Sequence, residues 1–394
     1  MDAELRKFDE IRPYEPEEMK QAFEDLLSDR QLSLLIKGFV PWLPQGVRNG
    51  LLRIAFLGVK TPLDFQKRFM KPIVKYLIWK YTDGCTFDDA ALRHTSLYGS
   101  RDARYTFLSN HRDIVLDSAF LDVMLVSHDY PTTVEIGIGD NLLIYPWIKR
   151  LVRMNKAFTV KRGLSAHEMM RSSQLMSTYI HYAVTRKHEN IWIAQREGRA
   201  KDSSDHTQDS VLKMLAMSGD GNHVDHLREL NIVPLTISYE YDPCDFLKAK
   251  EFQLKRDKPD YKKSNKDDLE NMRTGILGFK GRVHYHCGTP VNEWIDELAD
   301  LPRTEFFTAL SQRIDKEIYA GYCIYPGNYV ALDDLEGTTT YANKYTDKDK
   351  AMFDSYVKGQ IAKIDLPDKD ETFLRERILT MYANPLRHYL MCNA

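Results

Sequence analysis

The sequence has little that points to an oxidising compartment or to a membrane span. It contains five cysteines in 394 residues, an odd number with no Cys-x-x-Cys pair. Such usage is typical of a reducing compartment, so a disulfide framework is not expected. The first residues lack the basic and then apolar pattern of a secretory signal, and no apolar run reaches the roughly 18 residues that cross a bilayer. We therefore expect a cytoplasmic chain.

The chain also lacks a large net charge and any strong compositional bias. A net charge of -2 argues against a dedicated nucleic-acid binder. With 43% hydrophobic and 28% charged residues, the composition is that of an ordinary globular protein. A length of 394 residues allows one large domain with a helical extension, or two domains.

Two stretches are locally basic although the whole chain is nearly neutral. Between Gly46 and Lys80, eight lysines and arginines face a single acid, Asp64, and bulky apolar residues are mixed among them. This mixture suits a segment that lies on an anionic membrane surface, although two core-packing helices with solvated lysines have the same composition. A second run has no acid between Asn141 and Arg162; its members are Lys149, Arg150, Arg153, Lys156, Lys161 and Arg162.

The order of the patterns predicts an α/β fold. Residues 1–95 read as helices interrupted by proline and glycine, with no strand, and from about Tyr105 strand patterns alternate with helical ones. This alternation predicts a mostly parallel sheet with helices on both faces, preceded by an N-terminal helical segment (1–95) and followed, after the α/β domain (96–330), by a C-terminal helical extension (331–394). The expected strands are Tyr105–Leu108, Val134–Ile138, Phe158–Val160, Ile191–Ala194, Ile232–Ser238 and Arg282–Cys287.

The expected helices lie before, between and after these strands. The charge-dense stretch from Lys248 to Asn271 is poor in apolar residues, so we expect an exposed insertion or a mobile arm there. The helices are expected at Glu15–Phe39, Gln45–Leu57, Leu63–Tyr81, Leu116–Ser127, Leu142–Met154, Ala166–Thr185, Gln208–Met217, Glu293–Ala320 with a break at Pro302, Asp347–Lys363 and Glu371–Tyr382.

Four polar strips lie at or beyond the ends of expected strands, where ligands bind in open α/β sheets. The first holds His111 at a strand-to-helix turn, where it can act as a base while a nearby carboxylate fixes its tautomer and stabilises its charged form. Taken singly, each strip also fits a helix cap or a solvated strand end. In chain order they are Asn110-His111 with Asp117, Phe158-Thr159-Val160-Lys161-Arg162, Ile193-Ala194-Gln195-Arg196-Glu197-Gly198-Arg199-Ala200-Lys201, and Ile232-Val233-Pro234-Leu235-Thr236-Ile237-Ser238-Tyr239-Glu240.

Together the four strips resemble the glycerophosphate and 1-acylglycerol-3-phosphate acyltransferases. That family carries Asn-His-x(4)-Asp, a basic strip, Glu-Gly-x-Arg after a strand, and a Val-Pro pair in a late strand. The resemblance covers about Phe107 to Tyr241 and keeps the order of the strips. It implies the transfer of a fatty acyl group from acyl-CoA or acyl-carrier protein to glycerol 3-phosphate or 1-acylglycerol 3-phosphate in phospholipid synthesis, with no cofactor beyond the thioester donor.

The residue types suit that chemistry. Moving an acyl group from a thioester to an alcohol requires a base, for which we expect His111, oriented by Asp117. No Gly-x-Ser-x-Gly elbow is present, which disfavours a covalent serine route. A phosphate-bearing acceptor requires cations close by, and a glycine lets the backbone approach the ligand. The expected acceptor-binding residues are Lys161, Arg162, Glu197, Gly198 and Arg199.

Two departures from the family pattern leave alternatives open. Five residues separate His111 from Asp117, where the family has four. In an unbroken helix, six steps of about 100° place the two side chains on different faces, so His111 must lie in the turn before the helix, and Asp113 is an alternative partner. The third strip lacks the family's residue between glycine and arginine, which makes Lys201 an alternative to Arg199.

Other interpretations predict different behaviour. The same chemistry can act on another lyso-lipid acceptor, and a protein of this fold can bind lipid without catalysis. If the resemblance holds, the basic and apolar stretch from Gly46 to Lys80 would hold the protein at the cytoplasmic face of a membrane. Gln195 and Tyr239 are expected to be structural. We expect no metal site, because neither histidine pair with metal-like spacing has convincing further ligands; the pairs are His223 with His226 and His284 with His286.

Overall fold

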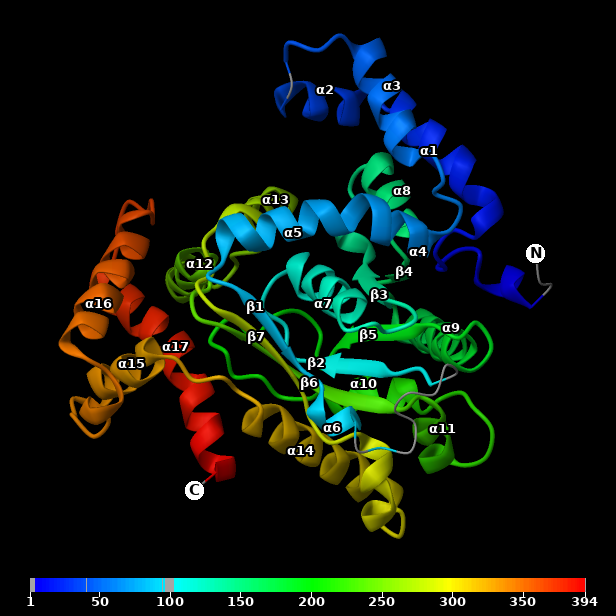
Figure 1. Ribbon diagram of the computed structural model, residues 1–394. Coiled ribbons are helices and arrows are strands. Elements are labelled where there is room, and N and C mark those ends of the chain that lie inside the picture. Colours follow the sequence, from blue (N-terminus) through cyan, green and yellow to red (C-terminus); the bar gives the residue numbers. More distant parts are fainter. Residues whose placement is uncertain (1–3, 40, 94, 96–102, 394) are drawn as a thin grey trace.

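A seven-stranded sheet lies at the centre of the computed structural model, which describes residues 4–39, 41–93, 95 and 103–393 (Figure 1). The strand order is β1-β7-β6-β2-β5-β3-β4, and every neighbouring pair is parallel except β6 with β7. The mostly parallel α/β sheet is therefore confirmed. The strands are β1 (Cys85–Asp88), β2 (Thr106–Ser109), β3 (Val134–Gly139), β4 (Ala157–Val160), β5 (Asn190–Ala194), β6 (Ile232–Tyr239) and β7 (Val283–Cys287).

The one strand that the sequence did not predict is β1. Its four residues, Cys-Thr-Phe-Asp, lie in the segment expected to be wholly helical, and that expectation is wrong. They pair in parallel with β7, nearly two hundred residues later in the chain. A strand this short, which ends on the first residue of the Asp88-Asp89 pair, has no readable alternation, and only its distant partner makes it a strand.

Helices cover both faces of the sheet, as predicted. On one face, α7 (Leu116–Ser127) and α5 (Lys71–Tyr81) bury apolar side chains against β2, β3, β6 and β7. On the other face lie α9 (Ala166–Thr185), α10 (Asp209–Leu215), α11 (His223–Glu229) and α14 (Arg303–Ala320). All eight residues of β6 are buried, because this strand is covered on both faces and paired on both edges.

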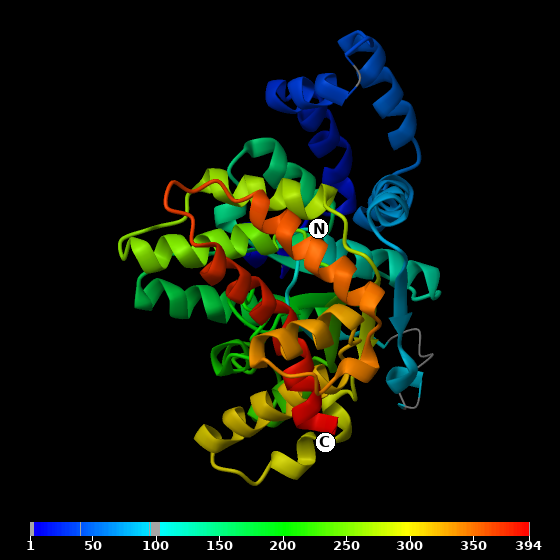
Figure 2. The same ribbon diagram turned by 90° about the vertical axis from the view of Figure 1, so that its left-hand side faces the viewer.

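The N-terminal segment folds as several helices rather than as one long one. The helix expected at Glu15–Phe39 is divided at Asp29, whose backbone is extended. Phe23 stacks on Phe56 with ring centroids 3.7 Å apart, which fastens the segment's first and third helices together. Figures 1 and 2 show α2 and α3 projecting beyond the sheet. The elements are α1 (Met19–Ser28), α2 (Arg30–Phe39), α3 (Gln45–Phe56), α4 (Pro62–Phe65) and a π-helical turn (Gln66–Met70) that leads into α5.

The second basic run mostly holds this segment against the rest of the molecule. The Arg153 guanidinium lies 4.4 Å from the centre of the Tyr14 ring. Lys161 Nζ pairs with Glu10 at 2.6 Å. Lys156 is buried, and its ammonium bonds to Glu189 at 2.7 Å. These cations are therefore engaged within the protein rather than gathered on one surface.

The expected exposed arm from Lys248 to Asn271 is instead largely helical and contributes buried side chains. It spans α12 (Asp245–Asp257) and α13 (Asn265–Leu277), in which Lys248, Glu251, Gln253 and Asn271 are buried. Its charges have partners in other parts of the chain; Lys201, for example, pairs with Glu251. A dense run of charge predicts solvent exposure only when those partners are missing.

The C-terminal extension is helical, as expected, and packs on α12 through Ala249. Its last helix, expected to end at Tyr382, continues through Pro385. Within the described part of the chain, no helix is both long enough and apolar enough to cross a membrane. The helices of the extension are α15 (Pro326–Glu336), α16 (Asp347–Ala362) and α17 (Glu371–Asn393), and the remaining ones are α6 (Ala90–Arg93) and α8 (Pro146–Met154).

Candidate functional site

His111 lies in the turn between β2 and α7, outside the helix, as its spacing to Asp117 requires. Its Nδ1 is 2.8 Å from Asp117 Oδ2. Asp117 is the second residue of α7 and is almost completely buried, with 1% of its side chain exposed. Because an ionised carboxylate only accepts hydrogen bonds, His111 donates from Nδ1, which leaves the Nε2 lone pair free to act as a base.

Asp113 is not the partner of His111. Its Oδ1 accepts hydrogen bonds from the backbone N–H groups of Val115 and Leu116, both at 2.8 Å, so it caps the first turn of α7. Burial, and then the neighbouring Asp117, raise the pKa of Asp113. The choice left open by the sequence is thus decided by geometry, because the cap and the base need different carboxylates.

Two buried side chains hold the turn in place. Asn110 donates to the main-chain oxygen of Ile237 at 2.9 Å and accepts from its N–H at 2.8 Å, which extends the pairing of β2 with β6. Arg112 pairs with Asp205 at 2.8 Å and donates to Ser203 at 2.7 Å. Although burial opposes it, Asp205 holds the pKa of Arg112 above its ordinary value. Both faces of the His111 turn are therefore fixed by buried polar contacts.

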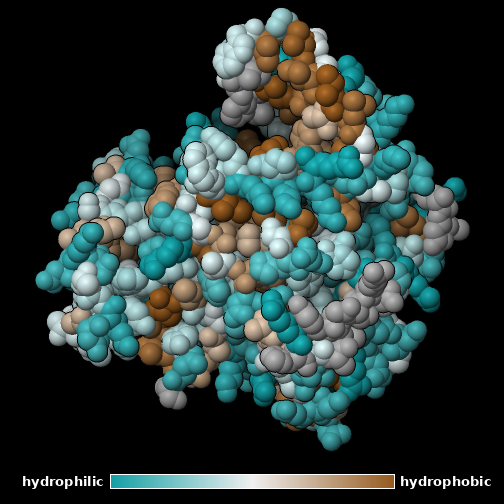
Figure 3. All heavy atoms as spheres, in the orientation of Figure 1, coloured by the Kyte–Doolittle hydropathy of each residue, from teal (hydrophilic) through white to brown (hydrophobic). Residues whose placement is uncertain are grey.

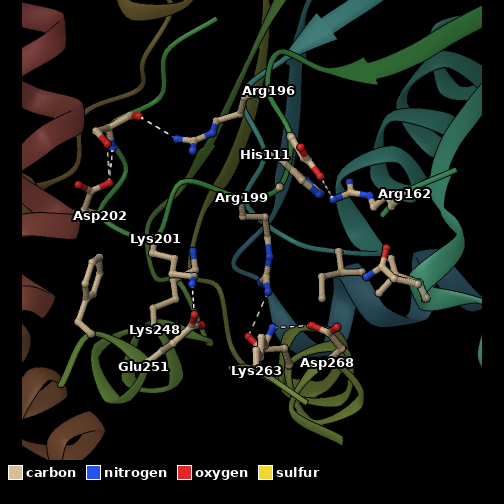
Figure 4. A pocket seen from close by; sticks show the side chains of 18 residues that line it. His111, Arg162, Arg196, Arg199, Lys201, Asp202, Lys248, Glu251, Lys263 and Asp268 are labelled. Atoms are coloured by element: carbon tan, nitrogen blue, oxygen red, sulfur yellow. Dashed lines mark hydrogen bonds and ion pairs between the residues drawn. The ribbon is translucent and has the colours of Figure 1, made fainter. Parts of the chain in front are cut away.

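His111 opens onto a cavity of about 560 Å³ at the carboxyl ends of the strands. Figure 4 shows His111 and Arg162 on one side of it, Arg199 near its middle and Lys201 with Glu251 on the other side. The cations outnumber the anions in its lining, so the cavity favours an anionic ligand. The lining cations are Arg162, Arg196, Arg199, Lys201, Lys248 and Lys263, and the anions are Glu197, Asp202, Glu251 and Asp268.

Arg162 and Glu197 meet at the cavity wall, as an exposed pair 3.0 Å apart. The Arg162 side chain crosses Gly139, where a Cβ would lie 2.6 Å from its Nε, so a larger residue there would displace it. Gly198 has a φ of +69°, a left-handed conformation that favours glycine. Glycine is favoured at both positions, by the space beside Arg162 at Gly139 and by the backbone conformation at Gly198.

Arg199 and Arg196 differ from the other cations of the cavity. Within the described part of the chain, neither guanidinium has a carboxylate within ion-pairing distance. Arg199 Nη2 donates to Asn271 Oδ1 at 3.1 Å, while its buried Nη1 has no hydrogen-bond acceptor among the described residues. Arg196 Nη1 reaches only the main-chain oxygen of Ser204, at 3.5 Å. These two side chains have donors to offer an anionic ligand.

The structure places the other two predicted cations differently. Lys161 lies outside this cavity, beside Glu10, and lines a separate surface hollow. Lys201, the alternative to Arg199, lines the cavity but is paired with Glu251. Although burial opposes it, that pairing lowers the pKa of Glu251. The sequence therefore located Arg162, Glu197, Gly198 and Arg199 at the cavity, but not the pairing that neutralises Lys201.

Sequence reasoning missed the side chains from α12, α13 and the loop between them. Lys248, Lys263 and Asn271 line the cavity although they follow Arg199 by about fifty to seventy residues. One sequence signal could have located the second of these helices: the Ser264-x-x-Asp267 capping box marks the start of α13. That box predicts a helix, yet nothing in it shows that the helix turns toward Arg199.

The histidine pairs with metal-like spacing serve other contacts. His226 has both ring nitrogens 2.9 Å from main-chain oxygens, and His223 packs its ring edge against Phe306. His284 and His286 hydrogen-bond to Thr86 and Asp88 of the neighbouring strand. Among the described residues, no three potential metal-binding side chains come together.

Comparison with known proteins does not identify the chain: no protein-family model matches it, and a search of the curated proteins finds no match. The geometry of the cavity therefore has to carry the functional interpretation.

Proposed function

We propose that the protein transfers a fatty acyl group from a thioester donor to a hydroxyl of a phosphorylated glycerol. The observation that carries this proposal is the His111–Asp117 pair, 2.8 Å apart, at the wall of a cavity rich in cations. A buried carboxylate, a histidine with one free nitrogen and unpaired guanidinium groups are the parts that acyl transfer to a phosphorylated alcohol requires. The order of the four strips supports the same reaction.

In the proposed reaction, Nε2 of His111 takes the proton of the acceptor hydroxyl as its oxygen attacks the thioester carbonyl. The tetrahedral intermediate then expels the thiolate as the C–S bond breaks. The imidazolium returns its proton to the thiolate, which leaves an oxygen ester, a free thiol and neutral His111. Asp117 stabilises the charged ring between these steps. The donor is acyl-CoA or acyl-carrier protein.

The phosphate of the acceptor would bind to Arg199 and Arg196, with Arg162 closer to His111. These guanidinium groups present paired N–H donors that match phosphate oxygens. The acceptor is glycerol 3-phosphate or its 1-acyl derivative, since both present a hydroxyl near a phosphate. Another lyso-lipid with a phosphate headgroup fits the same cavity, and a panel of acceptors separates these substrates.

The alternative of a catalytically silent lipid-binding protein predicts a His111 ring that lies beyond about 4 Å from any carboxylate, because base and orienting group must be near hydrogen-bond reach. The Nδ1–Oδ2 distance of 2.8 Å favours catalysis instead.

The direct test is a panel of acceptors incubated with labelled acyl donor and either wild type or His111→Ala. We expect ester formation on a phosphorylated glycerol and a rate about 10³-fold lower in the variant. His167→Ala, which removes an exposed histidine of α9, is the matched control and should keep the wild-type rate. The proposal fails if wild type acylates no acceptor, or if His111→Ala is fully active.

We also propose that the N-terminal helices bind an anionic membrane surface. Figure 3 shows apolar side chains gathered over α2 and α3, the end of the molecule that projects from the sheet. Val47, Leu51 and Ile54 recur along one side of α3 and are 48%, 53% and 65% exposed. Trp42, just before this helix, is 73% exposed. An uncovered stripe of this kind, flanked by cations, suits the boundary between lipid headgroups and acyl chains.

The cations come chiefly from the π-helical turn and from α5. Lys67, Lys71 and Lys75 recur every four residues and therefore share one side. Burial, and then the charges of Lys75 and Lys67, lower the pKa of Lys71. An anionic surface would offset the repulsion among these three ammonium groups. Two cations counted from the sequence do not contribute: Arg48 is buried, and Arg53 pairs with Glu24 at 2.6 Å.

Co-sedimentation with phosphatidylglycerol–phosphatidylcholine vesicles tests this surface. We expect wild type to bind, more weakly at high salt, and Leu51→Glu to lose most of the binding. Met352→Glu is the matched control, because Met352 on α16 is also 53% exposed but lies in the C-terminal extension. Wild-type protein that stays in the supernatant, or equal binding by Leu51→Glu, would contradict the proposal.

A further inference from the structure

The carboxylate of Asp117 receives hydrogen bonds on both oxygens. Oδ2 accepts from His111 Nδ1, from the N–H of Arg112 at 2.6 Å and from the N–H of Asp113 at 3.1 Å. Oδ1 accepts from the Tyr239 hydroxyl at 3.0 Å, the one donor that reaches it from the described part of the chain. The orientation of the carboxylate thus depends on the local turn through one oxygen and on Tyr239 through the other.

Tyr239 is the last residue of β6, and its ring is buried beneath the first turn of α7. Burial, above all, raises the pKa of Tyr239 well above its usual value, so the hydroxyl keeps its proton and donates to the carboxylate. The neighbouring strand supplies a second tyrosine, because the antiparallel register sets Tyr285 opposite Ile237. The Tyr285 hydroxyl bonds to the main-chain oxygen of Asp117 at 2.8 Å, not to its carboxylate.

We propose that Tyr239 is a positioning residue for acyl transfer, which acts on His111 through Asp117. The inference rests on the proposed function and adds a third member to the His111–Asp117 pair. Tyr239 touches neither substrate nor the reacting atoms. Its hydroxyl fixes the plane of the Asp117 carboxylate so that Oδ2 meets His111 Nδ1. The same hydrogen bond weakens the attraction of the carboxylate for the proton of the charged imidazole ring.

Removal of this hydroxyl changes His111 in a defined direction. Without its donor on Oδ1, Asp117 attracts the imidazolium proton more strongly, so the ring holds that proton to higher pH. The other charged or titratable groups around the pair stay in place in such a variant: Arg112 and Asp113 in the turn, Lys280 before β7, Tyr285 on β7, and Arg162 and Glu197 across the cavity wall.

The experiment compares Tyr239→Phe with Tyr285→Phe. Each variant loses one buried hydroxyl next to Asp117 and keeps the ring, but only Tyr239→Phe leaves a carboxylate oxygen without its donor. We expect Tyr239→Phe to lower kcat about tenfold with little change in KM, the loss of one hydrogen bond to a charged group, and to move the acid limb of the pH–rate profile to higher pH. We expect Tyr285→Phe to stay within about threefold of wild type, with an unmoved acid limb.

NMR separates this inference from the proposed function, because the His111 ring signal can be followed with pH without any substrate. A higher pH midpoint in Tyr239→Phe, but not in Tyr285→Phe, supports the positioning role even if no acceptor is acylated, in which case only the proposed function fails. Equal midpoints in wild type and Tyr239→Phe overturn the inference. So does an active enzyme in which the two tyrosine variants have the same kcat and pH profile.

Discussion

The two sides of the cavity are built in different ways. The base side, His111 with Asp117, comes from seven consecutive residues, and its carboxylate is buried and bonded on both oxygens. The cation side draws on several segments, and its pair nearest to His111 lies near solvent; Arg162 and Glu197 keep 36% and 71% of their side chains exposed. Buried, saturated polar groups tolerate little change, whereas exposed pairs exchange partners at small cost. Changes on the base side should therefore alter the chemical step, and changes on the cation side should alter affinity.

The largest effect should come from Asp117→Asn. The amide is uncharged and must present its NH₂ group either to Tyr239 or to the donors of the turn, so His111 loses the carboxylate that stabilises its charged form. We expect kcat to fall about 10³-fold with KM nearly unchanged, measured by steady-state kinetics on the best acceptor. Asp113→Asn is the control, because asparagine also caps helices, and it should keep kcat within about threefold. Equal losses in the two variants would mean that the base side is not organised by Asp117 alone.

On the cation side, Arg199→Ala should raise KM for a phosphorylated acceptor about 10- to 100-fold and leave kcat within a few-fold. The variant loses a charge-assisted hydrogen bond to the phosphate that is equally strong in the ground state and in the transition state. Lys161→Ala, which removes a cation from outside the cavity, should leave KM unchanged. If Arg199→Ala instead lowers kcat and spares KM, the proposed division between the two sides is wrong.

The contact between the two sides is tested by Gly275→Ala. Gly275 lies on α13, and a Cβ there would be 2.0 Å from Asp113 Oδ2, so the helix has to shift away from the turn. We expect a loss of about 1–3 kcal/mol in the free energy of unfolding, together with a lower kcat/KM, measured by denaturant titration and kinetics. Gly359→Ala on α16 is the control: beyond the backbone of its own helix, no described atom lies within 4 Å of the added Cβ, and alanine in a helix should stabilise by about 0.5–1 kcal/mol.

A smaller effect concerns pH and the buried cap. Because the pKa of Asp113 is raised on folding, the stability that this group contributes is present below its unfolded pKa, near 4, and is lost as the pH rises through its folded value. Asparagine does not ionise. The Tm of Asp113→Asn relative to wild type should therefore increase by a few degrees between about pH 4.5 and about pH 8.5. A constant difference in Tm over this range would show that Asp113 titrates alike in the folded and unfolded chain.

Much of the fold was predictable because its signals are local. Six of the seven strands begin and end within one residue of the expected positions, since each is a short apolar run between polar turns. The signals failed where structure depends on a remote partner. β1 is a strand because β7 lies beside it, and α12 with α13 is folded inward because Lys201, Asp242 and Arg199 meet its polar side chains.

In the candidate site, too, local features were predictable from the sequence and contacts with remote residues were not. The position of His111 in the turn followed from the angle per residue in a helix, and the structure has it there. Which carboxylate it meets did not follow, because Asp113 and Asp117 are both within reach along the chain. Lys161 and Lys201 could not be told from Arg199 either, since all three are cations near a strand end. Only the positions of Glu10, Glu251 and Asn271 separate them.

The sequence by itself determined the alternating α/β order and the turn that carries His111, because these depend on the conformational preferences of a few adjacent residues. Tertiary structure alone decided which charges are neutralised, that α13 forms a wall of the cavity, and that the Tyr239 hydroxyl reaches Asp117 across more than a hundred residues. The physical reason is the separation along the chain over which each interaction acts. Backbone preferences act over a few residues, whereas hydrogen bonds and ion pairs depend on distance in space, which folding sets.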